Sequence, residues 1–185
     1  MTDGPFYPPP AYRAKSLDWD ADLTTVRGFD PDGRPLPRAR GEHLDLRGAV
    51  LDADGRTVDG AEVEIWQCDA YGSYRHPRGA ASRVDAAFQG FGGTRSDAQG
   101  RYRFRTIKPV PYSGRTPHIH VRLRHASFGE LTSQLFVAGN PGNAGDVIYR
   151  RLSPAERALV DLSLQRASAD SPVMWTAERT LSVGA

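Results

Sequence analysis

The sequence contains little cysteine, no long hydrophobic run and almost no excess of charge, and each shortage excludes a class of protein. Cys68 is the lone cysteine among 185 residues, so the chain cannot form an internal disulfide. No apolar run is long enough to span a bilayer. Lysine and arginine total 24 against 22 acidic residues and form no basic block, so neither nucleic acid nor an anionic membrane is an expected partner.

The remaining composition is that of one folded domain. With 39% hydrophobic and 25% charged residues, the chain can bury a sizeable core and is not expected to be disordered. The first residues show no basic and apolar secretion signal, which favours the cytoplasm, although removal of a leader would leave the same sequence.

Proline and glycine are concentrated near the N-terminus. Residues 4–10 read Gly-Pro-Phe-Tyr-Pro-Pro-Pro, which is too rich in proline for a helix or a central strand and predicts an extended arm. Phe6, Tyr7 and Tyr12 indicate that this arm lies against its own domain or a neighbouring subunit. Residues 13–43 are polar and predict a long surface connection.

Short strands dominate the rest of the chain. Segments that alternate or run apolar between turn residues predict strands at residues 44–51, 61–68, 101–107, 118–124, 131–137 and 173–183. We therefore predict an all-β fold, a β-sandwich with long loops at one end and one short late helix. The chain then divides into an arm and connection, residues 1–43, and a sandwich domain, residues 44–185.

The helix signal and the turn signals are local. Ser153 and Glu156 form a capping box around Pro154, and apolar residues continue the helical pattern as far as Leu164. The pattern Asp-x-Asp/Gln-Gly-Arg predicts tight turns between strands at residues 30–34, 52–56 and 97–101. An EF-hand would need glutamate at the twelfth position of each loop, which these segments lack.

Arg101, Arg103 and Arg105 alternate with Tyr102, Phe104 and Thr106 in one predicted strand. This pattern is compatible with a sheet that reads RNA. The solvated outer face of a sandwich explains it more simply, and we prefer that interpretation.

His118 and His120 are separated by one residue in a predicted strand, so their side chains share a face. Two neutral imidazoles can hold one metal ion, but they suit several transition metals and do not identify it. Taken alone, the pair is better explained as a half-exposed strand pair that binds nothing.

A long connection, residues 69–100, follows the predicted strand at residues 61–68. Structureless loops of this length in compact domains are usually functional. Because loops at one end of a sandwich meet in space, Tyr74 and Tyr112 can lie beside the histidine pair. Each tyrosine is also explained as an aromatic plug in a half-buried loop.

Seven motifs occur in a characteristic order. They are Gly-Pro-Phe-Tyr-Pro at residues 4–8, Val-Glu-Ile-Trp-Gln-Cys-Asp-Ala at 63–70, Gly-Ser-Tyr-Arg-His at 72–76, Gly-Arg-Tyr-Arg-Phe-Arg-Thr-Ile-Lys-Pro at 100–109, Pro-Tyr at 111–112, Arg-Thr-Pro-His-Ile-His at 115–120 and Thr-Ser-Gln-Leu-Phe at 132–136. Together they resemble the intradiol ring-cleavage dioxygenases, in particular the β-subunit branch that cleaves protocatechuate and its single-domain relatives. The resemblance is strongest from about residue 44 to residue 140.

This resemblance implies a non-haem Fe(III) enzyme that cleaves a catechol-type ring between its two hydroxyls with O2, giving a cis,cis-muconate-type product. The ligands it implies for the ion are Tyr74, Tyr112, His118 and His120. Tyr112 would also accept a proton from the substrate, and Arg115 and Gln134 would lie over the substrate, with Arg115 stabilising negative charge. Phenolate oxygens suit the ferric state.

The sequence departs from the family pattern in one place near the site. Only five residues separate Tyr112 from His118, where related enzymes carry a longer loop, so one wall of the substrate pocket is shorter or comes from elsewhere. The family resemblance makes a homo-oligomer the expected assembly and a second, α-type subunit a possible partner. His76 and His125 are expected at the surface or behind the ligands.

Two other functions are compatible with parts of the sequence. The pattern of turns and strands is shared with metal-free, transthyretin-like sandwich modules, which have no reason to bring two tyrosines and two histidines together. A zinc hydrolase is less consistent, because no third histidine, cysteine or acid lies at a suitable spacing.

Overall fold

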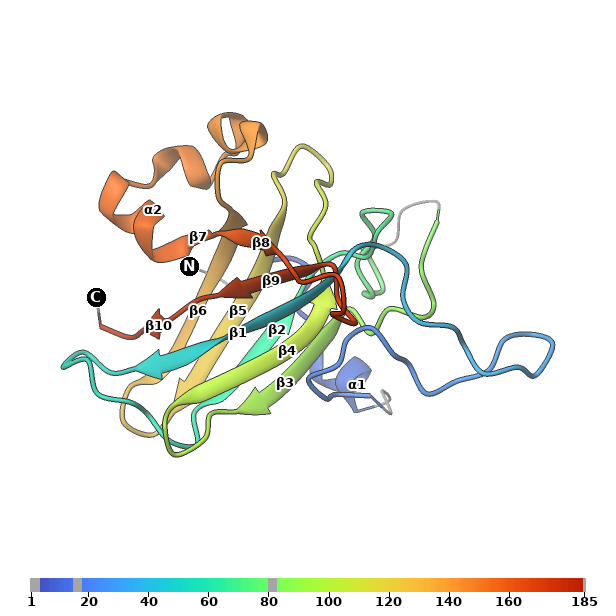
Figure 1. The fold of residues 1–185 in the computed structure, drawn as a ribbon, viewed down its shortest axis with the longest axis horizontal. Helices are drawn as coiled ribbons and strands as arrows, with labels where there is room; N and C mark the ends of the chain where they lie inside the picture. Colours follow the sequence, from blue (N-terminus) through green and yellow to red (C-terminus); the bar gives the residue numbers. More distant parts are fainter. Residues whose placement is uncertain (1–3, 15–17, 80–82, 185) are drawn as a thin grey trace.

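The computed structural model describes residues 4–14, 18–79 and 83–184, which form two β-sheets packed face to face (Figure 1). The first sheet is built around β1 (His43–Leu51), which pairs antiparallel with β4 (Arg101–Ile107) along most of its length. On its other side β1 pairs in parallel with strands from the end of the chain, so the C-terminal segment completes this sheet.

Those C-terminal strands are β9 (Trp175–Glu178) and β10 (Leu181–Ser182), and β8 (Leu164–Arg166) pairs antiparallel with β9. The second sheet has the order β3-β2-β5-β6-β7 and is antiparallel except between β6 and β7. Its strands are β2 (Glu62–Trp66), β3 (Phe91–Arg95), β5 (His118–His125), β6 (Gly129–Val137) and β7 (Asp161–Leu162). The predicted all-β sandwich is therefore confirmed.

The main core lies between the two sheets. Ile119, Val121 and Leu123 of β5 point into it and are at most 1% exposed, and Leu44 and Leu46 of β1 are fully buried in the same core. Each such side chain contributes roughly 1.5–3 kcal/mol through burial. Because side chains alternate along a strand, His118 and His120 point to the outer face of the second sheet.

The outer face of β4 is the solvated surface that the sequence predicts. Arg101 and Arg103 are exposed and Arg105 is half-buried, while Tyr102 and Phe104, which alternate with them, are buried. Arg103 donates two hydrogen bonds, of 2.7 and 2.8 Å, to the carboxylate of Asp45 on β1. The alternation therefore reflects a sandwich face whose arginines pair with acids.

The late helix, α2 (Pro154–Val160), lies at one end of the sandwich near β7 (Figure 1). Its predicted capping box is confirmed, since the Ser153 side chain accepts from the backbone of Glu156 and the Glu156 side chain accepts from the backbone of Ser153. The predicted continuation to Leu164 is wrong. The helix ends at Val160 because the next residues turn extended and pair with β6 as β7.

The predicted structureless loop at residues 69–100 contains β3, so that prediction is wrong in part. The strand includes Gly92 and Gly93, which hide the usual apolar alternation. A Cβ on Gly92 would lie 2.1 Å from the backbone oxygen of Asp20, so the N-terminal segment crosses this strand too closely for any side chain.

The N-terminal segment also differs from the prediction. One helical turn, α1 (Pro10–Arg13), interrupts the arm, because proline is tolerated in the first turn of a helix. The connection is not wholly at the surface, since Leu23 is fully buried in the main core. The arm contacts its own domain through Phe6 and Tyr7, whereas the side chain of Tyr12 lies outside the described residues.

Two short helices complete the fold. The short helices η1 (Pro141–Gly145) and η2 (Tyr149–Arg151) precede α2. The predicted final strand at residues 173–183 is divided into β9 and β10. Among the described residues, no helix combines the length and the apolar character needed to cross a membrane.

Candidate metal centre

His118 and His120 lie at the start of β5 and are 1% and 2% exposed. Across the ladders, His120 is paired with Trp66 of β2 on one side and with Gln134 of β6 on the other. The indole of Trp66 stacks on the imidazole of His120, with ring centroids 4.7 Å apart and an angle of 11° between the planes. The histidine pair is thus held on a rigid, buried part of the sheet.

The two imidazoles face each other through their Nε2 atoms, which are 3.3 Å apart. His118 Nδ1 lies 2.7 Å from the carbonyl oxygen of Thr116, which can only accept, so Nδ1 carries the proton and Nε2 keeps its lone pair. Burial lowers the pKa of His118 to about 4 and the pKa of His120 well below its usual value. Both rings are therefore neutral at pH 7, as metal ligands must be.

Tyr74 lies in the loop that follows β2, and an aspartate-centred turn places it. Asp69 Oδ1 accepts hydrogen bonds from the backbone of Tyr71 at 2.9 Å and of Ser73 at 3.0 Å, while Gly72 has a φ of 78°. This is the same turn as in the three Asp-Gly segments predicted from the sequence, which the structure confirms. Tyr74 is 3% exposed as a result.

Tyr112 and Arg115 are joined by a two-residue turn. Arg115 N donates to the Tyr112 oxygen at 2.7 Å, and Tyr112 N donates to the Arg115 oxygen at 3.3 Å. Ser113 and Gly114 both have positive φ, of 46° and 76°, which is the geometry of a type I′ hairpin turn. This tight turn allows the short segment before His118 to present both side chains.

The four predicted ligands come together. The ring of Tyr74 lies 4.9 Å from that of Tyr112 and 6.1 Å from that of His120, and Tyr112 lies 5.5 Å from His118. Burial raises the pKa of Tyr74 well above its usual value, and the neighbouring Tyr112 raises it further. The Tyr74 hydroxyl and His120 Nδ1 are buried without a hydrogen-bond partner among the described residues.

These residues fit a metal ion. Two nitrogens that each lie about 2.1 Å from one ion at near right angles are about 3 Å apart, close to the observed Nε2 separation. The unpartnered hydroxyl of Tyr74 is a buried polar group that an ion would satisfy. The described residues hold no group of three or more His, Cys, Asp or Glu, so the remaining donors near the histidine pair are the two phenols.

Arg115 is held between two acceptors. Its Nη2 donates to Gln134 Oε1 and its Nε donates to Asp146 Oδ2, each at 2.7 Å. The structure therefore brings together Arg115 and Gln134, as the family resemblance implies. Asp146 is a site residue that the sequence analysis missed; it follows η1, and no motif marks it.

Asp146 is fully buried and heavily hydrogen-bonded. Its carboxylate also accepts from the backbone of Thr116, Ile148 and Tyr149. Burial alone would raise the pKa of this carboxyl, but the Arg115 guanidinium and the backbone N–H groups lower it to about 2. Asp146 is thus an anion at any physiological pH, fixed beside the predicted substrate face of the site.

The other two predicted histidines do not join the four rings. His125 is half-buried at the far end of β5 and its Nδ1 lies 2.8 Å from Ser127 Oγ. His76 is 7% exposed, so it is buried and not at the surface; its ring contacts Phe6, with centroids 5.8 Å apart.

Comparisons with known proteins agree with the fold and identify the family. The dioxygenase family model matches residues 9–179. The chain is 37% identical over 172 residues to the protocatechuate 3,4-dioxygenase β chain of Burkholderia cepacia, covering 88% of this chain and 69% of that protein. It is 35% identical over 183 residues to the α chain from the same organism, covering 95% of this chain and 87% of that protein.

Solved structures show the same architecture. The dioxygenase domain of a carbohydrate-binding fusion protein from Streptomyces sp. SirexAA-E superposes with a TM-score of 0.70 at 22% identity, covering 99% of this chain and 95% of that domain. The fold is therefore that of a sandwich-type dioxygenase domain. The chain belongs to the intradiol ring-cleavage dioxygenase family and is an enzyme of that class. A metal-free binding module is not favoured.

Proposed function

We propose that this enzyme is an Fe(III) dioxygenase that cleaves a catechol-type ring between its two hydroxyl-bearing carbons with O2, giving a cis,cis-muconate-type product. The observation that carries the proposal is the convergence of two buried phenols and two neutral imidazoles, one phenol having no hydrogen-bond partner among the described residues. In this proposal the ligands are Tyr74, Tyr112, His118 and His120. The bound ion supplies Lewis acidity and a template for both catechol oxygens.

The two tyrosines have different surroundings, which assigns them different roles. Tyr74 is 3% exposed, whereas Tyr112 is only half-buried in a two-residue turn. Tyr112 can therefore move away with less loss of packing, and we assign it the role of accepting a proton from a substrate hydroxyl. Tyr74 and the two histidines would then hold the site together throughout turnover.

Arg115 and Gln134 form the polar side of the proposed substrate pocket. The Arg115 side chain is 16% exposed and carries a fixed positive charge, and the two-residue turn joins this residue to Tyr112. A fixed donor in a poorly hydrated site stabilises negative charge that develops on the substrate without reorganisation at the moment of reaction. Gln134 is the cross-strand neighbour of His120 and accepts a hydrogen bond from Arg115 Nη2. This bond keeps the Arg115 guanidinium oriented toward the face of the sheet that carries His118 and His120.

Protocatechuate is the first substrate to test, with hydroxyquinol and catechol beside it. The support is the identity to the two protocatechuate dioxygenase chains of Burkholderia cepacia. A homo-oligomer is the assembly that we propose. A second, α-type chain that completes the site is the alternative, because those relatives are an α chain and a β chain. Mass measurement of the purified chain in solution distinguishes the two.

The test is iron loading followed by oxygen uptake. The purified protein should take up Fe(III) and become red-brown through phenolate-to-iron charge transfer, and it should consume O2 with at least one catechol while forming a muconate-type product. Tyr74→Phe and Tyr112→Phe should each change the colour, whereas Tyr102→Phe, on the opposite sheet, should not. A protein that stays colourless with Fe(III), or a semialdehyde product, would overturn the proposal.

A further inference from the structure

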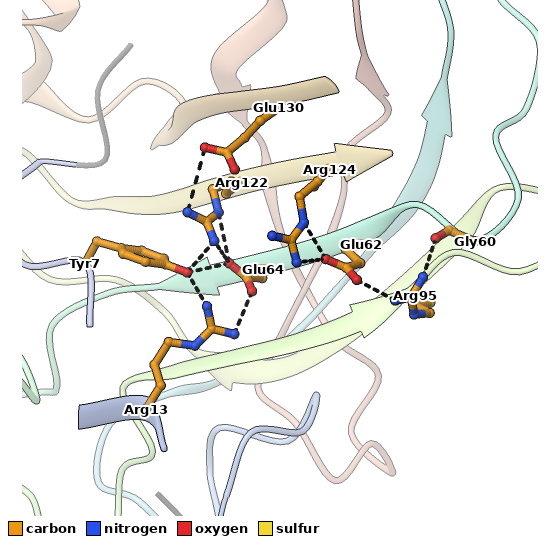
Figure 2. Close-up of polar contacts among 9 residues, drawn as sticks. All are labelled: Tyr7, Arg13, Gly60, Glu62, Glu64, Arg95, Arg122, Arg124 and Glu130. Carbon is orange, nitrogen blue, oxygen red and sulfur yellow. Dashed lines mark hydrogen bonds and ion pairs between the residues drawn. The ribbon is translucent and has the colours of Figure 1, made fainter. Parts of the chain in front are cut away.

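The hydroxyl of Tyr7 lies at the centre of a charged cluster on the outer face of the second sheet (Figure 2). It donates a 2.8 Å hydrogen bond to Glu64 Oε2. It accepts hydrogen bonds from Arg13 Nη1 and Arg122 Nη2, both at 2.5 Å. All the hydrogen-bonding capacity of the phenol is used, so the N-terminal arm is tied to strands β2 and β5 through one atom.

The charges of this cluster are poorly hydrated. The Glu64 side chain is 8% exposed and the Arg122 side chain 11% exposed, and they are directly paired across the β2–β5 ladder. Arg13 reaches the same carboxylate from α1 with a 2.9 Å ion pair. Hydrogen bonds to charged groups contribute more to stability than hydrogen bonds between neutral groups. Salt weakens charged contacts only slightly when they are shielded from water.

The next pair along the same face provides a contrast (Figure 2). Glu62 pairs with Arg124 across the ladder and with Arg95 on β3, but these two arginine side chains are 54% and 67% exposed. No arm residue among those described bonds to this outer pair. The ladder therefore carries one solvated ion pair and one buried ion pair, and the arm docks on the buried pair.

On the other side of the Glu64–Arg122 pair, the next pair on this face is Trp66 and His120. The cluster around Tyr7 therefore borders the candidate metal centre. The ring of Tyr7 meets the indole of Trp66 edge-on, with centroids 4.9 Å apart, and that indole stacks on His120. The preceding residue, Phe6, stacks on Tyr74 with centroids 4.7 Å apart. Of two consecutive arm residues, Phe6 thus packs directly against a proposed ligand, and Tyr7 packs against the indole that supports another.

We propose that Tyr7 is a positioning residue: its hydroxyl, held by Glu64, Arg13 and Arg122, locks the arm in place so that the arm fixes the rings of His120 and Tyr74 for metal binding. This inference rests on the proposed function, because it assigns Tyr7 a role toward the same ion. Tyr7 touches neither the ion nor the substrate in this proposal. It acts through Trp66 and through its neighbour Phe6.

The first test uses iron-free protein and the variant Tyr7→Phe, which removes one oxygen and leaves the ion pairs of Glu64 intact. Limited digestion with trypsin, followed by mass spectrometry, measures the rate of cleavage at the Arg13–Ala14 bond. This rate reports how often α1 unfolds locally. We expect cleavage there to become about tenfold faster, because loss of hydrogen bonds to charged groups promotes local opening. The matched control is Tyr102→Phe, which loses a hydroxyl bonded to the Arg179 carbonyl far from the arm.

The second test compares wild type, Tyr7→Phe, Tyr102→Phe and Glu62→Gln after loading with Fe(III). We expect Tyr7→Phe to bind iron about tenfold more weakly and to shift or broaden the charge-transfer band, while both controls keep wild-type values. Unfolding midpoints are measured alongside, since a general loss of stability would affect Tyr102→Phe equally.

The outcomes separate the two proposals. If wild type binds Fe(III) but Tyr7→Phe matches it in cleavage, affinity and spectrum, the positioning role is overturned and the proposed function stands. If wild type itself takes up no Fe(III), the proposed function is overturned, and the role of Tyr7 toward the ion falls with it.

Discussion

Arg115 donates from Nε to Asp146 Oδ2 over 2.7 Å, and the accepting carboxylate is fully buried. The second arm of the same guanidinium donates to Gln134. Arg115 is therefore fixed by two acceptors from separate segments, one after η1 and one on β6. The planar fork of arginine makes this possible, and an ammonium group could not satisfy both acceptors with one rigid geometry.

The first prediction concerns Asp146→Asn. The variant keeps the shape of the side chain but loses the charge that orients Arg115, so the guanidinium should no longer point reliably at the substrate. We expect kcat to fall about 10- to 100-fold, as is typical when a partner of an active-site group is removed. KM should change less, because the proposed ligands of the ion, which would bind the catechol oxygens, are untouched. Oxygen uptake with the iron-loaded protein measures both constants.

Asp45→Asn is the control for this prediction. It removes the charge and one of the two acceptors that Asp45 offers to Arg103 on the outer face of the first sheet, so it weakens a similar pair away from the site. We expect wild-type kcat from it. Wild-type kcat in Asp146→Asn, with iron content and unfolding temperature preserved, would show that Asp146 does not orient Arg115 for catalysis.

The second prediction is that Tyr74→Phe changes two properties in different ways: the stability of the iron-free protein and the affinity for iron. The Tyr74 hydroxyl is buried and unpartnered among the described residues, so removing it abolishes a desolvation penalty. We expect iron-free Tyr74→Phe to be as stable as wild type or more stable, by up to about 1 kcal/mol, while iron affinity falls sharply. Urea denaturation of iron-free protein and iron titration give the two quantities.

Tyr149→Phe gives the opposite expectation and serves as the comparison. The Tyr149 hydroxyl donates to Asp161 Oδ1 at 2.8 Å, so its removal takes a hydrogen bond from a charged acceptor. We expect it to lose roughly 1.5–3 kcal/mol of stability. If Tyr74→Phe is destabilised as much as Tyr149→Phe, the Tyr74 hydroxyl has a structural partner and is not reserved for a ligand.

The sequence predicts the sandwich because alternation within β1, β4, β5 and β6 records directly which side of each strand is buried. It does not predict β3, because Gly92 is required by the close approach of a segment some seventy residues earlier in the chain. It also misplaces the end of α2, since Leu162 fits a helical pattern equally well. Pairing with Val137 of β6 is a tertiary contact that no local pattern contains.

The site is predictable to a different degree. Local spacing places His118 and His120 on one face, and the family resemblance adds Tyr74, Tyr112, Arg115 and Gln134. Asp146 is missed because an aspartate after Gly145 looks like any polar loop residue; only its burial and its four donors distinguish it. The turn at Asp69 is missed because the third position of the repeat is occupied by Tyr71, not by an acid or amide.

The third prediction is a pH dependence of the iron-free protein that arises from His118. Burial is the main cause that lowers its pKa to about 4, from about 6.5 in the unfolded chain. The unfolded state therefore binds the proton more readily, so stability is constant above pH 6.5 and falls as the pH drops toward 4. We expect a loss of roughly 2–3 kcal/mol between pH 7.5 and pH 4.5, with His120 adding a loss of the same sign.

Urea unfolding of iron-free wild type and His118→Asn across this pH range measures the effect. The variant lacks the titrating group, so its stability should fall less between pH 7.5 and pH 4.5. Identical pH profiles for the two proteins would mean that His118 is already hydrated enough to take up a proton in the folded state.

The last prediction concerns Gly72→Ala, with Gly55→Ala as a closely matched control. Both glycines have a φ of 78° and both donate to an aspartate three residues earlier, Asp69 or Asp52, at 3.0 Å. Alanine at such a φ is strained in either turn, by about 1–2 kcal/mol. The surroundings differ: a Cβ at Gly55 meets nothing within 4 Å, whereas a Cβ at Gly72 lies 3.3 Å from the Cβ of Tyr112.

Because the turn at Gly72 carries Tyr74, the added methyl group pushes the two tyrosine loops apart. We therefore expect both variants to lose similar stability, while only Gly72→Ala weakens iron binding and changes the charge-transfer spectrum. Thermal unfolding and visible absorption of the iron-loaded proteins measure the two effects. Equal spectra in Gly72→Ala and Gly55→Ala would contradict the prediction, because contact between the two loops would then have no bearing on how the tyrosines meet the ion.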